Sequence, residues 1–170
     1  MHALDLVIKK VGLKEVSKKI SSSLNGMKVV CYYGCLMTRP PKATGKKDYE
    51  NPMDMEDLME TLGAVPLDWN MKTFCCGASA ALTQTEVVLD LTRQILDDAR
   101  DSGAQALVVG CPLCHANTDG RQKEINARHN TNFEIPVFYF TELLGLCLGL
   151  SPEELGIDKH LTNALDLIKK

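Results

Sequence analysis

Apolar residues along the chain occur in two patterns, short continuous runs and longer stretches with helical spacing. Four runs predict buried β-strands, at residues 27–31, 64–68, 106–109 and 136–140. The clearest helical spacing is that of Val88, Leu91, Ile95 and Ala99, which ends before Gly103. The chain is therefore expected to alternate strands with helices.

Residues with strong end preferences mark where the predicted helices begin. Thr83 and Glu86 form the pattern of a capping box, and Asn51 before Pro52 is typical of an N-cap followed by proline in the first turn. The expected helices are two short ones within residues 3–24, then 52–62, 83–102, about 114–128, 141–148 and a short one from Ser151-Pro152-Glu153-Glu154. Residues 38–51 lack periodicity and predict a surface loop.

The order of these elements indicates the fold class. Strands that alternate with helices favour an α/β fold, here a Rossmann-like open sheet of about four mainly parallel strands with helices on both faces. The 170 residues are enough for one substantial core. We expect a single cysteine-rich domain over residues 1–170, with N-terminal helices in 1–25, an α/β core in 27–150 and a C-terminal helix in 151–170.

Charge and hydropathy exclude several classes of function. The net charge is −3 and the basic residues are scattered, whereas nucleic-acid binding needs a clustered basic face. No apolar run approaches the roughly 20 residues of a membrane span, and the N-terminus lacks a signal-peptide core. We expect a cytoplasmic protein with no nucleic-acid partner and no membrane span.

Seven cysteines are the main chemical signal. In a reducing compartment such a number points to metal or redox chemistry instead of disulfides. Six fall into three groups that lie at or after the ends of predicted strands: Cys31 with Cys35, Cys75 with Cys76, and Cys111 with Cys114. Ligands of parallel sheets gather at the carboxyl ends of the strands, so these thiols should converge at one edge of the sheet.

Several kinds of site could use these thiols. Zinc needs only four ligands, and neighbouring thiolates such as Cys75 and Cys76 diverge, which suits a polynuclear iron-sulfur cluster better than one ion. The Cys111-Pro-Leu-Cys114 motif is also typical of glutaredoxins, and with His115 it matches the attachment site of c-type haem. Thiol exchange would leave the other cysteines unexplained, and haem attachment requires export.

The three groups together resemble the CCG domain of the B-type subunits of heterodisulfide reductase, specifically their C-terminal half. The resemblance implies a noncubane [4Fe-4S] cluster with zinc as the alternative metal, and five cysteine ligands: Cys35, Cys75, Cys76, Cys111 and Cys114. Cys35 is preferred because the family ligand follows a glycine, here Gly34. Cys31 stays a possible ligand, and Cys147 lies in an apolar stretch that predicts plain core.

The resemblance also implies a function. The chain would be an oxidoreductase subunit that passes electrons to a disulfide such as the coenzyme M–coenzyme B heterodisulfide of methanogenesis. The family's B-type protein carries two CCG domains and this chain only the second. A second CCG domain and the iron-sulfur electron donors of heterodisulfide reductase, its A-type and C-type subunits, are therefore expected partners, without which the chain should be inactive. The alternatives are a zinc-stabilised module and a non-catalytic electron-transfer or scaffold subunit. Tyr32, Tyr33 and Pro112 are expected at the rim of the cluster.

Overall fold

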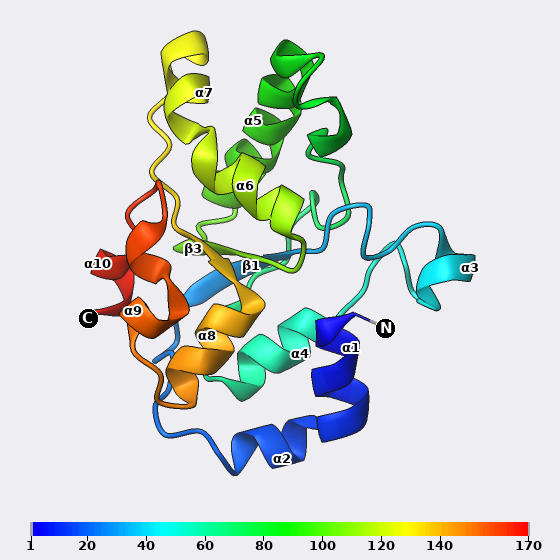
Figure 1. Ribbon diagram of the computed structural model, residues 1–170, viewed down its shortest axis with the longest axis vertical. Helices are drawn as coiled ribbons and strands as arrows, with labels where there is room; N and C mark the ends of the chain where they lie inside the picture. Colours follow the sequence, from blue (N-terminus) through cyan, green and yellow to red (C-terminus); the bar gives the residue numbers. More distant parts are fainter. Residues whose placement is uncertain (1, 170) are drawn as a thin grey trace.

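A four-stranded parallel sheet forms the centre of the computed structural model, which describes residues 2–169 (Figure 1). Its strands are β1 (Lys28–Tyr32), β2 (Val65–Pro66), β3 (Ala106–Val109) and β4 (Val137–Tyr139). They are ordered β2-β1-β3-β4, and every neighbouring pair is parallel. The predicted α/β class is confirmed. β3 has the predicted bounds, whereas β2 is shorter than expected because its pairing with β1 ends at Pro66.

Helices surround the sheet, and some of them are single turns. The α-helices are α1 (Ala3–Leu6), α2 (Leu13–Ser17), α3 (Pro41–Thr44), α4 (Asp54–Thr61), α5 (Thr85–Asp101), α6 (Pro112–Gly120), α7 (Gln122–His129), α8 (Phe140–Cys147), α9 (Pro152–Leu155) and α10 (Leu165–Ile168). A π-helical turn, η1 (Val7–Val11), continues α1, and two 3-10 turns are η2 (Ala78–Ala80) and η3 (Ile157–Lys159). Within residues 2–169, no helix is long and apolar enough to cross a membrane.

Both faces of the sheet are covered, which gives the protein two buried cores (Figure 1). Helices α5, α6 and α7 pack on one face, and α1, α2, α4 and α8 pack on the other. Along β1, Val30 and Tyr32 face the core that contains α5, α6 and α7. Val29 and Cys31 face the core that contains α1, α2, α4 and α8. This alternation follows from the two-residue repeat of a strand. It separates Cys31 from the side chains of its neighbours.

Two predicted helix starts are wrong, because the residues expected to cap them make other contacts. Helix α4 begins at Asp54 and not after Asn51, because Asn51 uses its Oδ1 to accept a hydrogen bond from Lys72 Nζ at 2.9 Å. Helix α5 begins at Thr85, and no capping box forms at Thr83, whose backbone N–H donates to Ala80 O in the preceding turn. The predicted loop 38–51 also contains the single turn α3.

The predicted helix 114–128 is two helices, α6 and α7, that meet at Arg121. α6 begins earlier than expected, with Pro112 in its first turn, where the missing proline N–H costs no hydrogen bond. Cys111 is consequently the N-cap residue. The capping box expected at Ser151 is confirmed, since Ser151 Oγ accepts from Glu154 N at 3.2 Å.

Candidate cluster-binding site

Five cysteines from distant parts of the sequence lie together at the carboxyl edge of the sheet. Cys35 follows β1, Cys111 and Cys114 follow β3, and Cys75 and Cys76 lie in the loop between β2 and α5. The Sγ atoms of Cys35 and Cys75 are 3.5 Å apart, and those of Cys76 and Cys114 are 3.7 Å apart. All are free thiols. The structure thus brings together the five side chains that the sequence singled out.

Gly34 makes this approach possible. Its φ of +64° lies in the left-handed region that favours glycine, and a Cβ at this position would lie 2.7 Å from Cys114 Sγ. The chain after β1 can therefore pass directly against the first turn of α6, which brings Cys35 to the same edge as Cys114.

The loop that carries Cys75 and Cys76 is fixed by backbone contacts with the end of β1. Lys72 O accepts hydrogen bonds from Tyr33 N at 2.9 Å and from Gly34 N at 3.3 Å. Closer to the thiols, Asn117 Nδ2 on α6 donates to Cys76 O at 3.1 Å. Sequence reasoning missed Lys72 and Asn117, because neither residue type at these positions carries a recognisable motif.

Local hydrogen bonds favour the thiolate form of two of the cysteines. A hydrogen bond from the Cys114 thiol lowers the pKa of Cys111 to about 5, against the effect of burial and with help from N–H groups at the start of α6. The contact with Cys114 also lowers the pKa of Cys76 to about 6, helped by Ala78 N–H and Asn117. Cys114 has a single thiol proton, so it donates to Cys111 or to Cys76 and not to both at once. Burial and the hydrogen bond to Cys75 raise the pKa of Cys35 to about 11. The edge thus offers thiolate ligands near neutral pH.

The number of converging sulfurs favours a polynuclear group over a single zinc ion. A structural zinc ion takes four ligands in a tetrahedron, whereas five thiols meet at this edge. Cys75 and Cys76 are neighbours in the chain, but their sulfurs approach different partners, Cys35 and Cys114. A cluster in which different irons take different ligands suits this arrangement better.

The other two cysteines lie away from this edge. Cys31 is fully buried on the opposite face of the sheet, so the structure does not bring it to the five thiols. Burial, with a contribution from the Glu56 carboxylate, raises the pKa of Cys31 well above its ordinary value, which makes the thiol unreactive. Cys147 is buried on α8 in the same core, as its apolar surroundings predicted.

The expected rim of the site is partly wrong. Tyr32 and Tyr33 are both fully buried, because helices cover both faces of the sheet where β1 ends. Pro112 is exposed, as expected. The exposed apolar residues beside the thiols form what we term the cysteine rim, namely Leu36, Phe74 and Leu113, whose exposed fractions are 63%, 40% and 50%.

The lowered pKa values predict an unusual titration of the cluster-free protein. As the pH rises from 4 to 7, the thiolate absorption band should grow by at least one thiolate per chain, since the pKa values of Cys111 and Cys76 are lowered to about 5 and about 6 by a donor that they share. Cys114→Ala removes the donor shared by both thiolates and should move this step upward by more than one pH unit.

Ultraviolet absorption measured against pH in the absence of metal checks this expectation. Cys147→Ala is the control, because burial alone raises the pKa of that thiol to about 11 and its loss should leave the step below pH 7 unchanged. An ordinary titration in which all thiols ionise above pH 8 would contradict the assigned hydrogen bonds.

Comparison with known proteins supplies relatives for this arrangement. The B-type subunit of a ferredoxin:CoB-CoM heterodisulfide reductase from Methanosarcina mazei is 31% identical over 99% of this chain and 57% of the relative. The membrane anchor subunit of an 8-methylmenaquinol:fumarate reductase from Wolinella succinogenes is 30% identical over 91% of this chain and 55% of the relative. The chain thus spans little more than half the length of these relatives.

Structural and family comparisons agree with the fold and the cysteine pattern. A crystal structure of a hypothetical protein from Helicobacter pylori superposes with a TM-score of 0.69 over 91% of this chain and 28% of that one, at 10% identity, which supports the fold alone. The family model of the cysteine-rich CCG domain matches residues 29–119, a segment that contains all five converging cysteines. The chain therefore belongs to the CCG family of cysteine-rich domains.

Proposed function

We propose that the chain is an iron-sulfur electron-transfer module of a heterodisulfide-reductase-type complex. Its five converging cysteines would hold one noncubane [4Fe-4S] cluster: Cys35, Cys75, Cys76, Cys111 and Cys114. The observation that carries the proposal is the convergence of these free thiols, with sulfur pairs at 3.5 and 3.7 Å, in a chain of the CCG family. A cluster held there would accept and release single electrons.

The surrounding residues support this role in three ways. N–H groups at the start of α6 and at Ala78 stabilise the charge of the thiolates of Cys111 and Cys76. Asn117 fixes the backbone at Cys76. The cysteine rim presents apolar surface beside the partly buried Cys35 and Cys75, which suits the docking of another protein surface.

The proposed substrate is a disulfide such as the coenzyme M–coenzyme B heterodisulfide. Splitting a disulfide takes two electrons, whereas one cluster passes a single electron in each step. We therefore propose that the chain works with a second CCG domain and with the A-type and C-type electron donors of such complexes. The additional length of its relatives supports the second domain. Steady turnover of a heterodisulfide by this chain alone, with an artificial one-electron donor, would contradict that dependence.

A second candidate is electron transfer without disulfide cleavage. The similarity to a subunit of a fumarate reductase favours it, because the named reaction of that enzyme involves no disulfide. Binding of the heterodisulfide to the cluster-loaded chain, measured by calorimetry, separates the two. Saturable binding at the cysteine edge supports the first candidate, and its absence supports the second.

Metal analysis tests the cluster itself. Protein purified without oxygen should contain about four irons and a matching amount of acid-labile sulfide per chain, as a [4Fe-4S] cluster requires. Cys76→Ala and Cys111→Ala should each lose most of both. Cys31→Ala and Cys147→Ala are matched controls and should keep them, since both thiols lie in the other core. Zinc bound by sulfur, with neither iron nor sulfide, would favour the zinc-stabilised module instead.

A further inference from the structure

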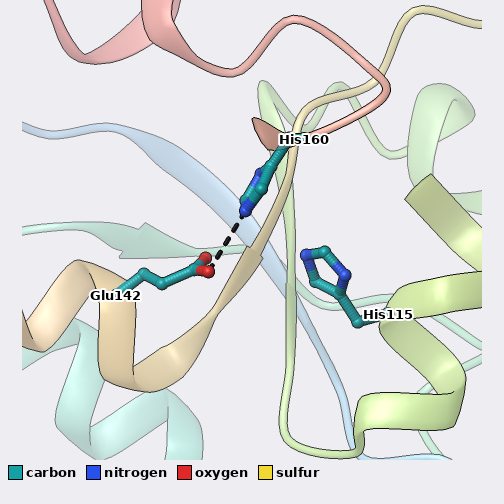
Figure 2. Close-up of side chains that lie close together, drawn as sticks. All are labelled: His115, Glu142 and His160. Carbon is teal, nitrogen blue, oxygen red and sulfur yellow. Dashed lines mark hydrogen bonds and ion pairs between the residues drawn. The ribbon is translucent and has the colours of Figure 1, made fainter. Parts of the chain in front are cut away.

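Three side chains outside the cysteine group form a compact cluster of metal-ligand type. His115 on α6, Glu142 on α8 and His160 after η3 each place one potential ligand atom within 4.8 Å of the other two (Figure 2). His160 Nε2 lies 3.1 Å from Glu142 Oε1, and the rings of the two histidines have their centroids 4.8 Å apart. The three residues come from separate elements and meet only through the fold.

Neighbouring groups fix the Glu142 carboxylate and the backbone that follows His160. Glu142 Oε2 accepts a hydrogen bond from Tyr139 N at 2.7 Å, which leaves Oε1 directed at His160. The residues after His160 are held by Asp119, whose carboxylate accepts from Leu161 N and from Thr162 N at 2.9 Å each. Outer contacts of this kind orient the ligands of metal sites in proteins.

The cluster also contains a polar atom whose bonding capacity is unused. His115 Nε2 is buried, and within residues 2–169 it has no hydrogen-bond partner. Its ring faces the pair formed by Glu142 and His160 (Figure 2). A buried polar atom without a partner destabilises the fold, and in the Nδ1–H tautomer this nitrogen presents a lone pair. An ordinary ion pair between Glu142 and His160 would leave it unexplained.

We propose that His115 Nε2, His160 Nε2 and Glu142 Oε1 bind one divalent transition-metal ion, with zinc as the best match. Two imidazoles and a carboxylate are a ligand set that zinc takes together with a water molecule. Imidazole ligands disfavour magnesium and calcium, which prefer oxygen. The 3.1 Å between His160 and Glu142 is close to the roughly 3.3 Å between ligands of a tetrahedral zinc with bonds of about 2.0–2.1 Å.

The site would connect the C-terminal segment to the helix that carries two of the cysteines. His115 directly follows Cys114 on α6, whereas His160 belongs to the segment after η3. The side chains of His160 and Glu142 are only 6% and 15% exposed, so an ion there would stabilise the packing of α6, α8 and this segment. The inference does not depend on iron at the cysteines.

X-ray absorption at the zinc edge tests the site directly. Full-length protein prepared without oxygen and with its iron loaded is dialysed against zinc chloride and then against buffer. We expect one retained zinc per chain with only nitrogen and oxygen neighbours, at about 2.0–2.1 Å, and no sulfur near 2.3 Å. Sulfur neighbours, or no retained zinc, would overturn the proposal whatever the variants do.

Variants assign the ligands. His160→Gln and Glu142→Gln should each weaken zinc binding by more than the roughly 10–100-fold that loss of an outer contact costs. His129→Gln is the matched control, because His129 also pairs with a carboxylate, that of Asp90 at 3.2 Å, but lies on α7. Circular dichroism verifies folding, and iron is counted separately from zinc. Wild-type zinc affinity in both folded variants would overturn the assignment.

Discussion

Replacing Gly34 with alanine is expected to abolish cluster binding, although the change removes no thiol. The new Cβ would lie 2.7 Å from Cys114 Sγ, well inside a normal contact of about 3.5–4.0 Å. Because Gly34 is tied to Lys72 O and Cys114 to the first turn of α6, neither partner can move away without displacing other thiols. We expect the iron content of Gly34→Ala to fall to less than about a fifth of the wild-type value.

The backbone strain of this substitution can be separated from the contact. Gly45 has a φ of +69°, close to the +64° of Gly34, but a Cβ there meets no atom within 4 Å. Gly45→Ala therefore carries the same strain of about 1–2 kcal/mol, which a domain with about 5–15 kcal/mol of stability tolerates. Iron and sulfide analysis of both variants, with thermal unfolding, checks the prediction. Equal iron in the two would show that Gly34 does not position the thiols.

The periodic pattern of the sequence is enough to predict the sheet and the edge where the thiols meet. Strand runs are local signals, and the rule that ligands gather where parallel strands end places Cys35, Cys75 and Cys111 together from the sequence alone. The same periodicity could have placed Cys31 on the opposite face of the sheet, away from the other thiols. A residue inside a strand points to the face opposite that of its neighbour Tyr32, whereas Cys35 lies beyond the strand's end.

The features that the sequence patterns did not predict depend on tertiary contacts. Asn51 has the right residue type for an N-cap, but it contacts Lys72 from a distant loop instead. Tyr32 and Tyr33 are both buried because helices from separate parts of the chain cover the two faces. The approach of His160 to His115 depends on how the C-terminal segment packs, and no local pattern encodes that packing.

Glu56→Gln is expected to be the most destabilising single substitution proposed. Glu56 and Lys72 form an ion pair of 2.9 Å whose side chains are only 3% and 7% exposed, and Tyr33 Oη donates to Glu56 Oε2 at 2.6 Å. Removing the carboxylate leaves the Lys72 ammonium buried without its counter-charge, which typically costs about 3–5 kcal/mol. For a chain of this size such a loss lowers the unfolding temperature by roughly 6–20 °C.

The same substitution should also weaken cluster retention, because the backbone of Lys72 holds the loop that carries Cys75 and Cys76. Removing both charges, as Glu56→Gln with Lys72→Met, should recover most of the lost stability, since a neutral buried pair has no unpaired charge. Glu15→Gln is the control: its pair with Lys18 is exposed and contributes at most about 1 kcal/mol. Thermal unfolding and iron retention are measured on all three. If Glu56→Gln lowered the unfolding temperature and the iron content no more than Glu15→Gln does, the buried pair would have no part in holding the thiols together.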